Sequence, residues 1–386
     1  MSDEQRQLFA TASALALGAA VSLGLARFVY ALLLPPMRAD LGWSYFTAGA
    51  MNTVNAAGYL VGALLLPRAL ARIDARSLLL GGSLATALAL ALHGLVRADA
   101  WLYALRALAG IGSAATFATG GLLAARLGQS PGARPALVLG LYYGGTGVGI
   151  LASALLVPPL DWPSAWFALA LAALLCTLLM AWGTRSLAAR PAAAPPRGEG
   201  FRARDFTFGL LGYLLFGLGY IGYMTFIVTL LREQGVGSFV VVAFYMLLGA
   251  GVIASSWLWA PLLQRYRGGQ PLAVLNGLLA LATLLPVLSA HPLAVFASGA
   301  LFGAVFLSVV ASTTALVRHN LPATAWPAGI AAFTIVFAAG QIVGPSLVGW
   351  VADGSGGLLR GLALSAGVLA IGALVATRQR ELPQRG

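Results

Sequence analysis

Apolar residues run through this 386-residue sequence in stretches that are separated by short segments carrying nearly all the charges. A helix of about 20 apolar residues is long enough to span the hydrocarbon core of a bilayer. The pattern predicts twelve such helices, at residues 8–34, 44–66, 77–96, 100–125, 136–157, 164–184, 206–231, 238–263, 271–290, 292–317, 324–351 and 358–377. The sequence therefore predicts an all-α membrane protein whose two termini lie on the same side of the bilayer.

Composition strengthens this prediction. Hydrophobic residues make up 60% of the chain and charged residues 9%, and the mean hydropathy is +0.88, which excludes a water-soluble domain. The net charge of +12 could suggest a protein that binds nucleic acid. The basic residues lie in short loops and form no continuous face, so no nucleic-acid partner is expected. The single cysteine, Cys176, falls inside an apolar stretch and is interpreted as a packing residue.

All basic residues are arginines, and they are unevenly distributed between the two sides of the predicted helices. Seventeen lie on the side shared with the termini and four on the other side, namely Arg38, Arg97, Arg232 and Arg360. Such an excess in short loops predicts that both termini are cytoplasmic. The two arginines left over, Arg27 and Arg106, lie inside apolar stretches.

A polar segment rich in Pro, Ala and Arg interrupts the chain at residues 185–205. It is interpreted as a cytoplasmic linker between two six-helix lobes, residues 1–184 and 206–386. A shift of half the chain lays Gly24-Leu-Ala-Arg-Phe-Val-Tyr30 on Gly217-Leu-Gly-Tyr-Ile-Gly-Tyr223. This correspondence supports a duplication that relates the two lobes by a pseudo-twofold axis.

Short motifs extend this picture to a known family. They are Arg106-Ala-Leu-Ala-Gly110-Ile-Gly112, Gly340-Gln-Ile-Val-Gly-Pro345, Arg27-Phe-Val-Tyr30 and Leu34-Pro35-Pro36. With twelve spans in a 6+6 division, the chain resembles the major facilitator superfamily, in particular the YbfB/YjiJ-like branch of bacterial permeases. The resemblance implies a monomeric carrier of the bacterial cytoplasmic (inner) membrane that needs no cofactor. It also implies a central cavity lined by helices one, four, seven and ten.

Two segments depart from the patterns of that superfamily. The loop between helices two and three reads Pro67-Arg-Ala-Leu-Ala-Arg-Ile-Asp-Ala-Arg76, with alanine where the family usually has aspartate. Arg72, Asp74 and Arg76 are proposed as a shifted version of the cytoplasmic gate. Helix five has glycines from Gly140 to Gly149 but lacks the Gly-Pro pair of the drug antiporters. The absence of this Gly-Pro pair favours other transport activities over drug efflux.

The intramembrane arginines are the main candidates for a site. An arginine at the bilayer centre costs about 2.5 to 3.5 kcal/mol on insertion scales, so two of them need a reason. Both are expected roughly 9 to 11 Å deep, at 1.5 Å per helical residue, where their guanidinium groups can hold one anion. The candidate ligand contacts are Arg27, Tyr30, Arg106 and Ser113 in the first lobe and Tyr220, Tyr223, Ser308, Ser312 and Gln341 in the second.

Structural roles compete with this interpretation for every candidate. Either arginine could clamp exposed carbonyl groups, and helix-four arginines of the superfamily often serve coupling or packing. Tyrosines along helix seven could pack between helices, and Gln341 could bond a neighbouring helix. Asn52, Asn55 and Tyr59, on one face of helix two, are expected to bond neighbouring helices.

The eleven acidic residues all fall at or beyond the ends of the apolar stretches, so the membrane core offers no carboxylate for proton coupling. Anion exchange, facilitated diffusion and proton symport with the substrate remain open. The leading hypothesis is a secondary active transporter of a small organic anion, most simply a carboxylate, working by alternating access. The alternatives are a proton-coupled efflux antiporter and a transporter-like sensor or assembly factor. No motif for an enzyme or a metal site is present.

Overall fold

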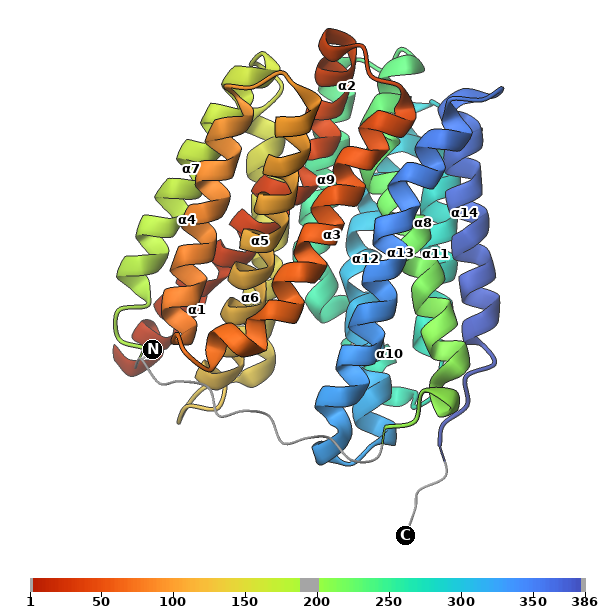
Figure 1. The fold of residues 1–386 in the computed structure, drawn as a ribbon. Coiled ribbons are helices and arrows are strands. Elements are labelled where there is room, and N and C mark those ends of the chain that lie inside the picture. The colour runs from red at the N-terminus through yellow and green to blue at the C-terminus, as the bar shows by residue number, and fades with distance from the viewer. Residues whose placement is uncertain (1–2, 188–200, 383–386) are drawn as a thin grey trace. The chain divides into compact units, whose positions relative to one another are not determined.

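The computed structural model describes residues 3–187 and 201–382, and all of their regular structure is helical. Among these residues, twelve helices are long and apolar enough to cross a membrane (Figure 1). The predicted fold class is therefore confirmed. The predicted linker at residues 185–205 lies largely outside the described residues; its end forms a short 3-10 helix, η2 (Ala203–Phe206).

Contacts divide the chain into two compact units. The first contains Met1–Gly42 and Val54–Ala194, and the second contains Trp43–Thr53 and Pro195–Gly386. The start of the second predicted span thus groups with the second unit, whereas we placed it in the first lobe. The lobe boundaries 1–184 and 206–386 stay a prediction.

The helices of the first half begin with a span built from three segments, α1 (Asp3–Ala19), η1 (Ala20–Phe28) and α2 (Tyr30–Leu41). The remaining helices of this half are α3 (Tyr45–Leu70), α4 (Ala75–His93), α5 (Asp99–Leu127), α6 (Pro135–Leu156) and α7 (Trp162–Gly183). In the first unit α1 and η1 pack against α6, while α4 packs against both α5 and α7.

The helices of the second half are α8 (Thr207–Glu233), α9 (Ser238–Leu258), α10 (Ala260–Arg265), α11 (Gln270–Leu288), α12 (Pro292–Asn320), η3 (Ala323–Ala325), α13 (Trp326–Ala352) and α14 (Gly357–Ala376). Here α8 packs against α13 and α14, α9 against α12, and α11 against α12 and α14. The first span and α8 therefore have corresponding neighbours, α6 and α13. The same correspondence relates α4 with its partners to α11 with its partners, as expected of a duplicated unit.

Two proline sites explain where helix boundaries differ from the prediction. The first span continues to Leu41, not residue 34, because Pro35 and Pro36 are accommodated inside α2. Proline removes one backbone donor but keeps a helical φ, and a membrane helix tolerates it when its neighbours satisfy the backbone. The eighth span is instead interrupted at Trp259, two residues before Pro261. The indole of Trp259 donates to the carbonyl of Ala304 at 2.7 Å and fixes this break.

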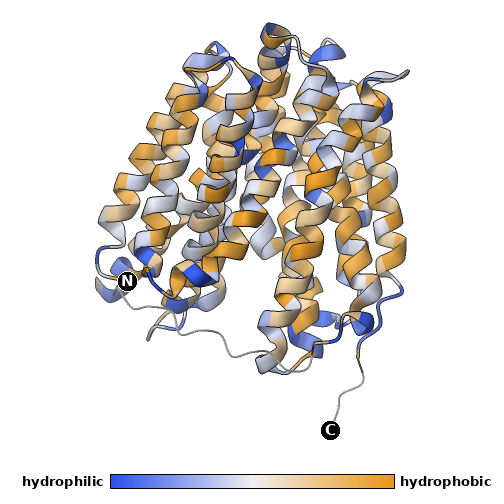
Figure 2. Cartoon of the chain, in the orientation of Figure 1, coloured by the Kyte–Doolittle hydropathy of each residue, from blue (hydrophilic) through white to orange (hydrophobic). Residues whose placement is uncertain are grey.

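Most spans are apolar on all sides, since their outer faces meet lipid and their inner faces meet other helices. In α7, Trp166 and Leu169 are buried, whereas Leu171 and Leu178 are more than half exposed. Figure 2 shows the hydrophilic residues gathered mainly at helix ends and loops. This exposed apolar surface would be unstable in water and is suited to a bilayer.

Close helix packing in the first unit depends on glycines of α6. A Cβ on Gly24 of η1 would lie 2.5 Å from the Cα atom of Gly149, so the two backbones touch. Gly145, one turn earlier on α6, contacts the carbonyl group of Ala16 in the same way. Small residues four apart let membrane helices approach this closely. The glycine-rich stretch of helix five therefore serves packing of the first span.

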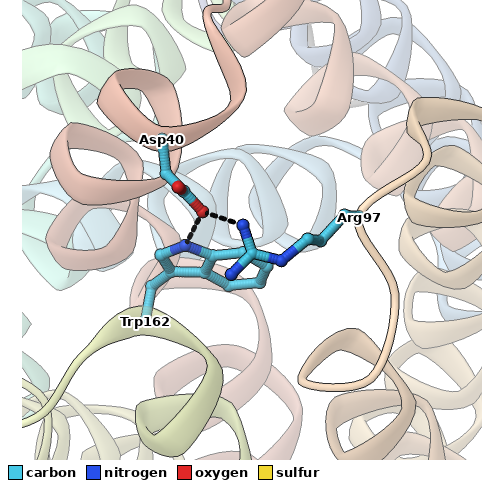
Figure 3. A network of polar contacts seen from close by, with 3 residues as sticks. All are labelled: Asp40, Arg97 and Trp162. Atoms are coloured by element: carbon cyan, nitrogen blue, oxygen red, sulfur yellow. Dashed lines mark hydrogen bonds and ion pairs between the residues drawn. The ribbon is translucent and has the colours of Figure 1, made fainter.

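A polar cluster connects three segments at one end of the first unit (Figure 3). One carboxylate oxygen of Asp40 accepts hydrogen bonds from Arg97 at 2.6 Å and from the indole of Trp162 at 2.8 Å. The guanidinium carbon of Arg97 lies 5.5 Å from the centre of the Trp162 ring. The cluster ties the end of α2 to the start of α7 and to the loop before α5.

Asp74 is the N-cap of α4, and we predict that it stabilises the fold in a pH-dependent way. Its carboxylate accepts from the amide of Ser77 at 3.0 Å and from its hydroxyl at 2.6 Å, which lowers the pKa of Asp74 below its usual value near 4. Asp74→Ala should cost about 1 kcal/mol at pH 7. Because the folded pKa is the lower one, this contribution is present above pH 4 and disappears as the pH falls through the folded pKa.

Thermal unfolding of the purified protein in detergent measures this effect. Asp74→Ala is expected to lower the Tm by roughly 1 to 2 °C at pH 7. Asp74→Asn, which keeps a capping oxygen, is the matched control and should lie close to the wild type. An equal Tm for the wild type and Asp74→Ala at pH 7 would contradict the capping role.

Candidate functional site

Arg27 lies in an unusual segment of the first span. Residues Ala20–Phe28 form a π-helix of nine residues, and every one of them is buried. The amide of Val29 continues the π pattern by donating to the carbonyl of Gly24 at 3.1 Å. π-Helices are rare, are mostly single turns within α-helices, and occur often at functional sites. The side chain of Arg27 is 4% exposed, and its guanidinium carbon lies 5.3 Å from the centre of the Tyr59 ring.

Arg106 of α5 contacts the same segment from a neighbouring helix. Its Nη1 donates to the carbonyl of Ala26 at 3.2 Å, within η1. Its guanidinium carbon lies 4.5 Å from the centre of the Tyr30 ring, close enough for a cation–π interaction. Asn55 of α3 donates to the carbonyl of Arg106 at 3.0 Å. We call Arg27, Tyr30, Tyr59 and Arg106 the arginine cluster.

The arginine cluster corrects the expected position of Arg27. Since the first span extends to Leu41, Arg27 lies 14 residues before its end, so it is farther from that end than the predicted boundary implied. Arg106 still lies near the start of its helix, which begins at Asp99. The bond from Arg106 to Ala26 nevertheless places the two arginines at the same level.

The cluster carries positive charge without a nearby acid on its helices. In the described chain, every aspartate and glutamate lies in a loop or in the first or last turn of a helix. Arg27 and Arg106 are both at least 96% buried, so their charges are largely removed from water. Aromatic faces stabilise a buried guanidinium by about 0.5 to 2 kcal/mol, whereas an arginine at the bilayer centre costs about 2.5 to 3.5 kcal/mol on insertion scales. Two buried guanidinium groups can donate charge-assisted hydrogen bonds to an anionic group.

The second unit contains an aromatic stack around Tyr220 of α8. The rings of Phe216 and Tyr220 are 4.6 Å apart, and Phe337 of α13 lies 5.4 Å from Phe216 and 5.7 Å from Tyr220. Gln341, one turn after Phe337, donates to the hydroxyl of Tyr220 at 2.7 Å. We call Phe216, Tyr220, Phe337 and Gln341 the Tyr220 stack. It presents planar aromatic surfaces together with one amide and one hydroxyl group.

The other predicted contacts of the second half bond to protein groups. Tyr223 lies 2.6 Å from the hydroxyl of Ser298, which in turn donates to the carbonyl of Ala282. Ser308 donates to the carbonyl of Ser255 at 3.1 Å, and Ser312 to that of Val309 at 2.7 Å. In the first half, the buried hydroxyl of Ser113 has no hydrogen-bond partner among the described atoms. The hydrogen bonds of Tyr223, Ser308 and Ser312 therefore connect these three side chains to neighbouring helices or to their own helix.

The proposed gating residues are spread over separate interactions. Asp74 caps α4 through Ser77. Arg76 donates to the carbonyl of Ala181 at 2.8 Å and to the hydroxyl of Thr184 at 3.2 Å, which ties it to the end of α7. Arg72 lies in the turn before α4 and is exposed. Within the described ranges, no ion pair joins these three side chains, and their gating role stays a prediction.

On sequence alone, Tyr59 is assigned to helix bonding and Phe337 is not named. Tyr59 lies one turn from Asn55 on α3, and both contact an arginine of the cluster. Phe337 lies one turn before Gln341 on α13 and stacks on the partner of that glutamine. Helical spacing from the polar residues of α3 and α13 could have identified both.

Comparisons with known proteins agree with this architecture. Residues 19–377 match the family model described as "Uncharacterised MFS-type transporter YbfB". The chain is 30% identical over 357 residues to a chloramphenicol resistance protein of Streptomyces lividans, covering 86% of this chain and 87% of that protein.

Solved structures show the same fold at low sequence identity. A D323A mutant of the nucleoside transporter NupG aligns with a TM-score of 0.75 at 14% identity, over 95% of this chain and 99% of NupG. The human organic anion transporter MFSD10 aligns with a TM-score of 0.65 at 16% identity, over 97% of this chain and all of that chain.

Proposed function

Because the chain belongs to the YbfB-type transporters of the major facilitator superfamily, we propose that its substrate is a small organic anion, most simply a carboxylate. The observation that carries this proposal is the arginine cluster, with two buried guanidinium groups on spans whose acids all lie at their ends. An anion that enters such a site gains charge-assisted hydrogen bonds in a region of low dielectric. We propose alternating access as the transport cycle.

The contacts of the two arginines suggest different roles. Arg106 donates to the Ala26 carbonyl and stacks on Tyr30, so it holds η1 as well as carrying charge. Arg27 lies within η1 itself. We propose Arg27 as the ligand anchor and Arg106 as the residue that positions it. A guanidinium has five N–H donors in a planar fork, which suits bidentate binding of a carboxylate.

The Tyr220 stack is the second proposed ligand surface. Its flat aromatic faces suit the apolar body of an organic anion, while the Tyr220 hydroxyl and the Gln341 amide supply polar contacts. Tyr30 and Ser113 are proposed as further ligand contacts in the first half. Tyr223, Ser308 and Ser312 are proposed as a supporting layer, and their hydroxyl groups, like that of Tyr220, also bond to other protein groups.

Flux through reconstituted liposomes tests the proposal. The purified carrier should exchange labelled mono- or dicarboxylates across the bilayer, and unlabelled organic anions should compete. Neutral nucleosides, chloramphenicol and lipophilic cations serve as the comparison set. Flux restricted to those neutral or cationic compounds would overturn the anion assignment.

Efflux is a second candidate function, because the chain is 30% identical to a protein named for chloramphenicol resistance. Cells that express the carrier would then survive higher concentrations of the drug than cells with an empty vector.

The same liposomes distinguish the coupling modes. An imposed pH gradient accelerates proton symport and leaves exchange and facilitated diffusion unchanged. We also propose a cytoplasmic-membrane location with both termini in the cytoplasm, on the basis of the arginine asymmetry.

A further inference from the structure

A pocket of about 590 Å³ lies at one end of the second unit, away from the arginine cluster and the Tyr220 stack along the chain. The loop between α10 and α11 forms one side, and the segment after α14 forms the other. Its lining residues are Arg265, Tyr266, Arg267, Gly268, Gln270, Arg380 and Glu381. We call it the arginine pocket. None of these residues has been used for the proposed transport site.

Two amide side chains, those of Asn320 and Gln379, hold the two sides of the arginine pocket together. Asn320, at the end of α12, donates to the carbonyl of Arg267 at 2.7 Å and accepts from the amide of Leu382 at 2.6 Å. The side chain of Gln379 is 3% exposed, and it donates to the carbonyl of Arg380 at 3.0 Å. The amide of Gly269 completes the connection by donating to the carbonyl of Gln379 at 2.8 Å. The backbone on both sides is therefore fixed.

The charges of the arginine pocket are unbalanced. Three guanidinium groups face one carboxylate, that of Glu381, and within the described ranges Glu381 forms no ion pair with them. The guanidinium carbon of Arg265 lies 5.6 Å from the centre of the Tyr266 ring. The 19-residue helix α11 begins beside the pocket at Gln270, and its N-terminal dipole adds to the positive potential. The pocket is thus suited to an anion with several acceptor oxygens.

The ends of three membrane spans locate the arginine pocket relative to a bilayer. The eighth span ends at Arg265, the ninth begins at Gln270, and the twelfth ends at Ala376. The pocket therefore lies at the level where lipid phosphates meet water. Exposed Trp257 and Leu258, at the end of α9, provide apolar surface for acyl chains on the span that leads to it. Arginine-rich sites in such places bind anionic headgroups.

We propose that the arginine pocket binds a phosphate-bearing anion, namely the headgroup of an anionic membrane lipid. Its volume exceeds what a lone phosphate ion needs and falls in the range of ligand sites. Bound lipid would connect the α10–α11 loop to the segment after α14 and stabilise this end of the second unit. The site goes beyond the proposed transport function and does not depend on the substrate.

Lipid binding to the purified full-length carrier in detergent tests the proposal. Phosphatidylglycerol is compared with phosphatidylcholine of the same acyl chains, by native mass spectrometry and by thermal shift. The triple variant Arg265→Gln, Arg267→Gln, Arg380→Gln should bind phosphatidylglycerol at least about tenfold more weakly than the wild type. The control variant Arg202→Gln, Arg318→Gln, Arg360→Gln removes the same charge outside the pocket and should stay within about twofold of the wild type.

Other outcomes overturn the proposal. Equal binding of phosphatidylglycerol by the wild type and the pocket variant would exclude the site. Inorganic phosphate or glycerol 3-phosphate that binds as tightly as the lipid and displaces it would identify a soluble ligand instead. Arg380→Gln alone is included because a single exposed substitution is compatible with folding, and it should weaken lipid binding severalfold. Failure of anion flux does not affect this experiment, since lipid binding is read without transport.

Discussion

Arg27→Gln is expected to abolish anion transport while the protein stays folded. Two charge-assisted hydrogen bonds to a carboxylate contribute about 3 kcal/mol or more, so ligand affinity should fall roughly a hundredfold. Stability should change little, because removing the buried charge relieves a desolvation cost of about 2.5 to 3.5 kcal/mol, which offsets the loss of interactions such as the cation–π contact with Tyr59. Counterflow in liposomes and ligand-induced thermal shift measure the two properties separately.

Two further substitutions control for the Arg27 result. Arg27→Lys keeps the charge but not the planar fork, and it should retain part of the transport with weaker substrate binding. Arg360→Gln removes an exposed arginine at the start of α14 and should transport at the wild-type rate. Wild-type flux by Arg27→Gln would show that this residue does not anchor the ligand.

Arg106→Gln should also lose transport, but through a different mechanism. The substitution removes the hydrogen bond to the Ala26 carbonyl and the stack on Tyr30, so η1 loses its contact with α5. Losing a hydrogen bond from a charged donor costs about 1.5 to 3 kcal/mol and losing the cation–π interaction up to about 2, and the relieved desolvation cost offsets these losses in large part. We therefore expect a small change in Tm and at least a tenfold loss of flux, because Arg27 is displaced.

Hydrogen exchange distinguishes a residue that positions Arg27 from a residue that binds the ligand directly. Amides of residues 20–28 should exchange faster in Arg106→Gln than in the wild type, whereas Arg27→Gln should leave their protection unchanged. Arg106→Lys, which keeps a donor and a charge, should partly restore both protection and flux. Unchanged exchange in Arg106→Gln together with lost flux would contradict the positioning role and make Arg106 a direct ligand contact.

The spans were predictable because the bilayer imposes a length and an apolar composition on any helix that crosses it. The predicted end of the first span, residue 34, is wrong by seven residues, because the helix continues through Pro35 and Pro36 to Leu41. Whether a membrane helix continues through proline depends on its neighbours, which a local pattern does not contain. The candidate Gln341 could be selected as a buried amide, but its partner, Tyr220, is on another helix.

The sequence by itself determined that this protein is a twelve-span membrane protein with two arginines and no acid in its apolar core, because hydrophobic length and charge position are properties of the chain. Only the tertiary structure decided that Ala20–Phe28 is a π-helix and that Arg106 donates to a carbonyl within it. At that point Gly24 packs directly on Gly149 of α6, and the bond requires α5 to lie alongside η1. Both are contacts between distant segments, which no local pattern encodes.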